Sequence, residues 1–153
     1  MRRPSLISST LAAALAAGAA FAGEGGAMTD GLLVSGAGAV AAAEAPARVR
    51  VDLARAASAS EGVVILTLTP ERIAPGEPFL VSIVAEDAAG GAREIASMSF
   101  FPPPREGEAR GFPVDLSSLA TEGETTLSVR LVPATSAALD ETRVRVEGLR
   151  AGE

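Results

Sequence analysis

The stretch "GVVILTLTPERIAPGEPFLVSIVAEDAAGG", residues 62–91, sets the fold class of this chain. It begins with a nearly continuous apolar and β-branched run at residues 62–68, which is typical of a central strand. A second run at residues 78–86 alternates between apolar and polar positions, as a half-buried strand does. Pro and Gly at residues 74–78 and the glycines at 90–91 supply the backbone conformations that tight reversals need. The stretch therefore predicts two antiparallel strands joined by a turn.

Five more segments carry the same strand signal, and no long helical pattern separates them. They are residues 47–53, 92–101, 109–116, 125–132 and 142–149. The segment 109–116 contains Pro113, which cannot donate a hydrogen bond to a neighbouring strand, so we expect it at a sheet edge. One helical turn is expected at residues 115–119, where Asp115 or Ser117 can cap it. The pattern as a whole predicts a seven-stranded antiparallel β-sandwich of immunoglobulin-like type over residues 47–150.

The composition excludes several kinds of chemistry. The 153 residues include no His and no Cys, so disulfides, imidazole or thiolate catalysis and the usual zinc, copper, haem and iron–sulfur ligands are all missing. The net charge of -6 argues against binding to nucleic acid or to an anionic membrane surface. We therefore expect no catalytic, cofactor-binding or metal-binding residues, and a protein that is not an enzyme.

The first 22 residues predict a signal peptide. Arg2 and Arg3 are followed by an apolar run of small residues and by an A-x-A motif that ends at Ala22. The run is short and rich in Ala, which favours cleavage between Ala22 and Gly23 over a membrane anchor. Every cationic side chain is Arg, a bias that indicates a high-GC bacterium. We expect a secreted or periplasmic bacterial protein with no membrane span after processing.

Residues 23–46 are rich in Gly and Ala and predict a disordered linker. Within them Gly36, Gly38 and Ala41 match the G-x-G-x-x-A pattern of dinucleotide-binding proteins. That pattern requires a crossover helix of about a dozen residues or more, and Pro46 ends the run too early for one. We therefore interpret the glycines as part of the linker.

The stretch "SMSFFPPPREGEARG", residues 97–111, holds the candidate interaction site. Alternation along a strand directs Phe100 to the core together with Met98, and directs Phe101 to the opposite face. An exposed ring beside a rigid proline run makes an apolar surface suited to protein recognition. The candidate interaction residues are Phe101, Pro102, Pro103, Pro104 and Arg105. The alternative is that the second ring tucks under the loop 102–108 and closes the end of the sandwich.

Charged residues suggest weaker candidates. Arg48 and Arg50 in the first predicted strand, and Arg143 and Arg145 in the last, form two R-x-R-V patterns. If these strands were neighbours, the four arginines would form a patch for an acidic partner; otherwise they are solvated strand faces. The acidic pairs at residues 86–87, 106/108 and 140–141 lack the spacing of a calcium loop and are interpreted as solvated loop charges.

Four segments follow one another along the chain in an order similar to that of a known domain. They are "REIASMSFFPPP" (93–104), "GFPVDLSSL" (111–119), "LSVRLVP" (127–133) and "TRVRVEGL" (142–149). Over residues 49–149 the chain resembles the C-terminal β-sandwich that follows the dicopper domain in plant polyphenol oxidases and bacterial tyrosinases. The resemblance implies an accessory or covering domain that contacts another exported protein, such as a tyrosinase-like copper oxidase.

Residues 68–91 also resemble the opening of bacterial immunoglobulin-like modules. The alternative function is therefore a small cell-envelope module that binds a ligand or a carbohydrate. Sugar binders usually stack rings on aromatic side chains, and this chain has no Trp and no Tyr.

Overall fold

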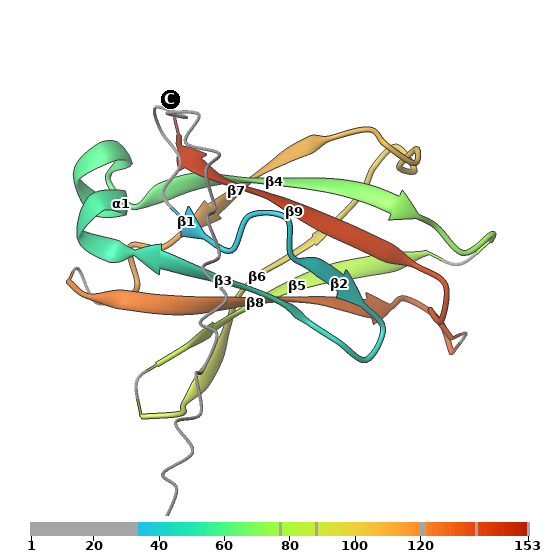
Figure 1. Cartoon of the computed structure of the whole chain (residues 1–153), viewed down its shortest axis with the longest axis horizontal. Coiled ribbons are helices and arrows are strands. Elements are labelled where there is room, and N and C mark those ends of the chain that lie inside the picture. Colours follow the sequence, from blue (N-terminus) through green and yellow to red (C-terminus); the bar gives the residue numbers. More distant parts are fainter. Residues whose placement is uncertain (1–33, 77, 88, 120–121, 137, 153) are drawn as a thin grey trace, which may run out of the picture.

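A computed structural model of the chain describes residues 34–152, apart from residues 77, 88, 120–121 and 137. These residues form two antiparallel sheets that pack face to face, with one short helix (Figure 1). The elements in chain order are β1 (Val34–Ser35), β2 (Val40–Ala42), β3 (Ala47–Asp52), α1 (Leu53–Ser60), β4 (Val63–Arg72), β5 (Phe79–Glu86), β6 (Ala92–Ser99), β7 (Arg110–Asp115), β8 (Glu124–Pro133) and β9 (Arg143–Ala151).

The strand order confirms the predicted β-sandwich. One sheet has five strands in the order β1-β3-β8-β5-β6, and the other has four in the order β2-β9-β4-β7. The seven predicted strands correspond to β3 to β9, so the described residues contain nine strands where the sequence predicted seven. The strand that contains Pro113, β7, lies at the edge of its sheet as expected.

The predicted disordered linker is wrong for residues 34–46. Val34 of β1 pairs with Val51 of β3, and Ala41 of β2 pairs with Val144 of β9. Ala41 is fully buried. These short strands cover backbone groups of β3 and β9 that would otherwise form open sheet edges. The segment thus crosses from one sheet to the other and belongs to the sandwich.

Two glycines make this crossing possible. Gly36 and Gly38 lie between β1 and β2 with φ angles of 101° and 91°, a region that residues with a side chain rarely adopt. They form a turn and not the start of a nucleotide-binding helix. The rest of the predicted linker, the predicted signal peptide (residues 1–22) and the proposed cleavage bond between Ala22 and Gly23 lie outside the described residues.

The hydrophobic core lies between the two sheets. Alternate residues of each long strand point inward, because successive side chains of a strand face opposite sides. The fully buried aliphatic side chains include Val49, Val51, Val64, Leu66, Leu68, Val81, Ile83, Val114, Leu127, Val129, Val144, Val146 and Leu149. Most charged positions of the same strands face solvent, whereas Thr69, Ser82, Thr125 and Ser128 are buried polar residues within the strands.

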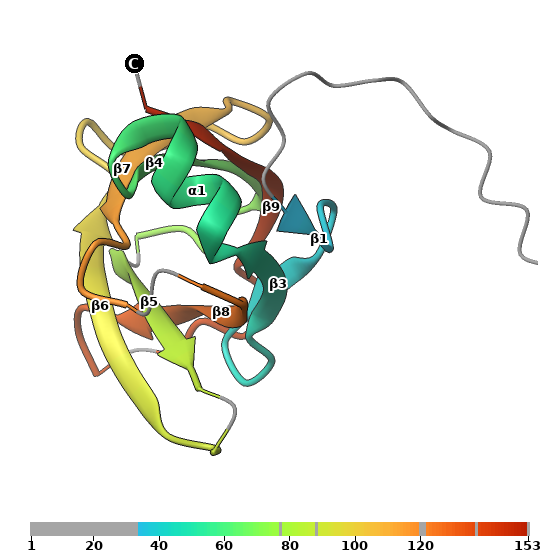
Figure 2. The same ribbon diagram turned by 90° about the vertical axis from the view of Figure 1, so that its left-hand side faces the viewer.

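Helix α1 covers one end of the sandwich, as Figure 2 shows. It begins after Asp52, whose side-chain oxygen accepts a hydrogen bond from the backbone N–H of Arg55 at 3.0 Å. Leu53 and Ala56 are buried against the core. The sequence pattern did not predict this helix and instead favoured a helical turn at residues 115–119. Asp115 there accepts a bond from the Ser117 N–H at 2.8 Å in a turn without a helix.

Candidate binding pocket

An apolar pocket of about 360 Å³ opens at the end of the sandwich opposite α1. Four segments that are far apart in the sequence form it: the connection between β4 and β5, the end of β6, the proline run after it, and the residue that follows β8. The lining residues are Ile73, Ala74, Gly76, Pro78, Phe79, Leu80, Ser99, Phe100, Pro103, Pro104 and Ala134. Among the described lining residues Ser99 alone has a polar side chain, so this part of the pocket favours an apolar occupant.

Aromatic rings form one side of this pocket. Phe100 is 8% exposed and lies between two other phenylalanines. Its ring centroid is 5.6 Å from that of Phe79, in a tilted arrangement, and 5.0 Å from that of Phe112, in an edge-to-face arrangement. Aromatic pairs at these distances and angles stabilise each other. Phe100 therefore belongs both to the core and to the pocket wall.

The proline run forms a second side and is held at both ends. The Arg110 guanidinium donates a hydrogen bond to the carbonyl of Pro102 at 2.6 Å, and it also pairs with Glu108 at 3.1 Å. Further along the loop, the N–H of Gly107 donates to the carbonyl of Pro70 at 2.7 Å. These contacts fix the segment from residue 102 to residue 107, whose prolines already restrict the backbone.

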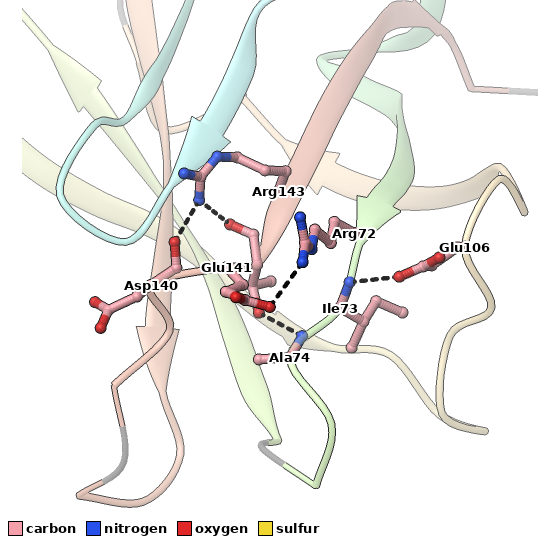
Figure 3. A network of polar contacts seen from close by, with 8 residues as sticks. Arg72, Ile73, Ala74, Glu106, Asp140, Glu141 and Arg143 are labelled. Carbon is pink, nitrogen blue, oxygen red and sulfur yellow. Dashed lines mark hydrogen bonds and ion pairs between the residues drawn. The ribbon is translucent and has the colours of Figure 1, made fainter.

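The connection between β4 and β5 forms the third side, and a polar network holds it in place (Figure 3). The N–H of Ile73 donates to Glu106 Oε1 at 3.0 Å. The N–H of Ala74 donates to the hydroxyl of Thr142 at 3.0 Å in a buried position. Arg72 pairs with Glu141 at 2.9 Å beside them. These contacts hold Ile73 and Ala74, the first residues of this wall, against neighbouring segments.

The structure agrees with the sequence analysis about the two phenylalanines. Phe100 is buried and Phe101 is 89% exposed, so the alternative in which Phe101 tucks under the loop is wrong. Pro103 and Pro104 line the pocket, whereas Phe101, Pro102 and Arg105 stand outside the lining. The burial of Phe100 and the exposure of Phe101 are confirmed, and the interaction role of the segment stays a prediction.

Several pocket residues were missed because their segments look ordinary in the sequence. Ile73 and Leu80 bracket a Gly–Pro turn, and Ala134 follows a strand. A useful signal was present: Ile73 is an aliphatic residue in the connection between two strands, where polar residues are usual. The sequence alone does not reveal that these residues meet the proline run, because that depends on which strand ends share one end of the sandwich.

The predicted patch of four arginines does not form. Arg48 and Arg50 lie on β3 in the five-stranded sheet, whereas Arg143 and Arg145 lie on β9 in the four-stranded sheet. Arg145 pairs with Glu71 at 2.8 Å and with Glu147 at 2.9 Å. The R-x-R-V patterns are therefore two separate surfaces on opposite sides of the molecule.

Arg145 and Glu147 form an ion pair on the outer face of the four-stranded sheet. Glu147 lies at an irregularity of β9, where Thr67 pairs with Gly148 and Leu68 with Val146. The Thr69 hydroxyl is the largest influence that lowers the pKa of Glu147, and the Arg145 guanidinium lowers it further.

The acidic residues offer no second site. Within the described ranges, no group of three or more acidic side chains is close enough to hold a metal ion. Glu106 and Glu141 belong to the network in Figure 3, and Asp87 accepts backbone hydrogen bonds from Ala89 and Gly91 in its own turn. No helix in the described part of the chain is long and apolar enough to cross a membrane.

Comparisons with known proteins place the chain in no family. No protein-family model matches the chain, and no curated protein matches it either. Among solved structures, a mutant of a family 29 carbohydrate-binding module is similar, with a TM-score of 0.37 and 16% sequence identity. The similar region covers 69% of this chain and 61% of that chain.

Proposed function

We propose that this β-sandwich is a non-catalytic binding module that docks onto another protein and takes an apolar side chain of that protein into the pocket. One observation carries the proposal. An apolar pocket with fixed walls opens beside Phe101, a ring that is 89% exposed. An aromatic ring next to a preformed apolar pocket is an arrangement that protein interfaces use for their strongest contacts.

The energetics suit such docking. Burying an exposed Phe side chain contributes about 1.5–3 kcal/mol. The proline run that carries Phe101 is held by Arg110 and by the Gly107–Pro70 hydrogen bond, so little backbone freedom is lost on binding. A second apolar anchor from the partner, placed in the pocket, would add a similar amount. Together these terms suit an interface centred on a few apolar contacts.

A neutral sugar fits the pocket less well than an apolar group. Sugar hydroxyls need hydrogen-bond partners when they lose water, and within the described residues the lining side chains offer only the hydroxyl of Ser99. A small apolar ligand is the second candidate, because about 360 Å³ lies at the lower end of the range for small-molecule pockets. This second candidate corresponds to the alternative function predicted from the sequence, a small cell-envelope module that binds a ligand.

We also propose where the protein acts and which class of partner it contacts. The predicted signal peptide supports an exported protein, so the partner is another secreted or periplasmic protein. The resemblance to the covering domain of tyrosinases makes a tyrosinase-like copper oxidase the first partner to test. In that family the domain packs against the dicopper domain, and the end of this sandwich that carries Phe101 is the surface we assign to the contact.

The test is a selection of displayed peptides on the purified protein, followed by affinity measurement for the selected sequences. Three variants report on the site. Ala134→Leu adds volume to the lining of the pocket, and Phe101→Ser removes the exposed ring. Ala138→Leu makes the same change as the first variant at an exposed position that does not line the pocket. The fluorescent probe anilinonaphthalene sulfonate serves as the small apolar ligand.

We expect selected peptides to share an apolar anchor residue. Ala134→Leu and Phe101→Ser should each weaken their binding about tenfold, a free-energy loss of about 1.4 kcal/mol. Ala138→Leu should leave binding unchanged. If peptides bind equally well to all variants, the docking proposal is wrong. If the probe binds tightly at the pocket and no peptide does, the small-ligand candidate replaces it.

A further inference from the structure

A polar hollow of about 460 Å³ lies on the outer face of the five-stranded sheet. It is lined by residues of β1, β3, β5 and β8 and of the turn after β1, namely Ser35, Gly36, Arg48, Arg50, Glu86 and Thr126. Leu80 of the apolar pocket and Glu86 of the hollow are six positions apart on β5, which corresponds to about 20 Å along a strand. The hollow is therefore separate from the docking pocket.

Strand register brings the lining side chains together. Arg50 of β3 lies opposite Thr126 of β8, and Thr126 lies opposite Glu86 of β5. Ser35 of β1 flanks Arg50 on the other side. Arg48 is two positions before Arg50 and projects from the same face, roughly 7 Å away. Two guanidinium groups, two hydroxyl groups and one carboxylate thus meet on one surface.

The charges in the hollow do not cancel. Arg48 Nε is 3.6 Å from Glu86 Oε1, and the same oxygen accepts a hydrogen bond from the hydroxyl of Ser128 at 2.8 Å. Arg50 makes no ion pair and no hydrogen bond through its side chain within the described part of the chain. Among the lining residues two cations lie with one anion, and Arg50 is the exposed cation that has no ion-pair partner within the described residues.

The surroundings limit what can bind there. Asp52 and Glu124 face each other in the next row beyond Arg50, and Glu94 lies across the sheet opposite Val84. The chain as a whole carries a net charge of -6. Nucleic acids and anionic membranes need a broad basic surface, and these flanking carboxylates would repel them. The hollow therefore suits a ligand whose negative charges are isolated among neutral polar groups.

We propose that this hollow binds the carboxylate of an acidic saccharide, such as a uronic acid unit. The Arg50 guanidinium presents donors in a planar fork that matches a carboxylate. The hydroxyls of Ser35 and Thr126 and the carboxylate of Glu86 offer donors and acceptors to the surrounding sugar hydroxyls. A Cβ at Gly36 would lie 3.0 Å from the carbonyl oxygen of Arg48, so Gly lets the turn after β1 pass close to the backbone of β3 beside the hollow.

The experiment measures the binding of a galacturonate oligosaccharide and of the neutral galactose oligosaccharide of the same length to the full chain by titration calorimetry. Arg50→Gln removes the unpaired charge. Arg150→Gln is the matched control, because it makes the same change at an exposed position of β9 in the opposite sheet. Circular dichroism melts check that both variants fold. Poly-glutamate and a sulfated polysaccharide complete the panel.

We expect the galacturonate oligosaccharide to bind at least tenfold more tightly than the neutral one. Arg50→Gln should weaken that binding at least tenfold, while Arg150→Gln should change it less than twofold. Equal losses in the two variants would mean attraction to overall charge and would overturn the site. Binding of the neutral sugar with equal affinity, or tighter binding of poly-glutamate or the sulfated polysaccharide, would overturn the ligand class, and absence of binding would overturn both.

Discussion

Truncation of Phe100 to Ala is expected to destabilise the sandwich far more than the same change at its neighbour, Phe101. Phe100 is 8% exposed, so its ring loses nearly all its contact with water on folding. Burial of a Phe side chain contributes about 1.5–3 kcal/mol through transfer out of water. Truncation to Ala also leaves a cavity between Phe79 and Phe112, so we expect a total loss of about 3–5 kcal/mol.

The matched change at Phe101 should behave as a surface substitution. Its ring is 89% exposed, so Phe101→Ala should alter the free energy of unfolding by less than about 0.5 kcal/mol. Both variants replace one Phe with Ala, at adjacent positions, so they have the same amino-acid composition. Any difference between them therefore reports the direction in which each ring points.

Urea unfolding followed by far-ultraviolet circular dichroism measures both changes. The chain has no Trp and no Tyr, so intrinsic fluorescence offers little signal. We expect the midpoint of Phe100→Ala to fall steeply, and its melting temperature to drop by roughly 4 °C for each kcal/mol. Equal losses in the two variants would refute the reasoning, because both rings would then have to contribute to the core.

Three further outcomes are expected. Thr142→Val should cost about 1–3 kcal/mol in urea unfolding, because it leaves the buried N–H of Ala74 without an acceptor, whereas Thr142→Ser should retain most of the stability. The lowered pKa of Glu147 means that its contribution to stability is present above its unfolded pKa and is lost as pH falls through the lower folded value. Glu147→Gln should therefore reduce the loss of stability on acidification, measured as the urea midpoint against pH, and an unchanged pH dependence would contradict this. Intact-mass measurement of exported material should show a chain that begins at Gly23, and a full-length mass in the cytoplasm would contradict the predicted signal peptide.

The sequence by itself determined where the seven long strands run and, where apolar and polar residues alternate, which side of a strand is buried. This information is local, because a period of two along the chain reflects the alternation of side chains within one strand. The same local rule separated Phe100 from Phe101. The absence of His and Cys also excluded whole classes of chemistry without reference to any fold.

Only the tertiary structure decided which strands became neighbours. β1 and β2 lie in a Gly- and Ala-rich segment without alternation, and they exist because β3 and β9 offer backbone partners. The apolar pocket draws its walls from four distant segments, and the hollow around Arg50 depends on the register of three strand pairs. Such arrangements follow from long-range pairing, whose energy comes from contacts between residues far apart in the chain, and no local pattern in the sequence encodes which distant partner each strand finds.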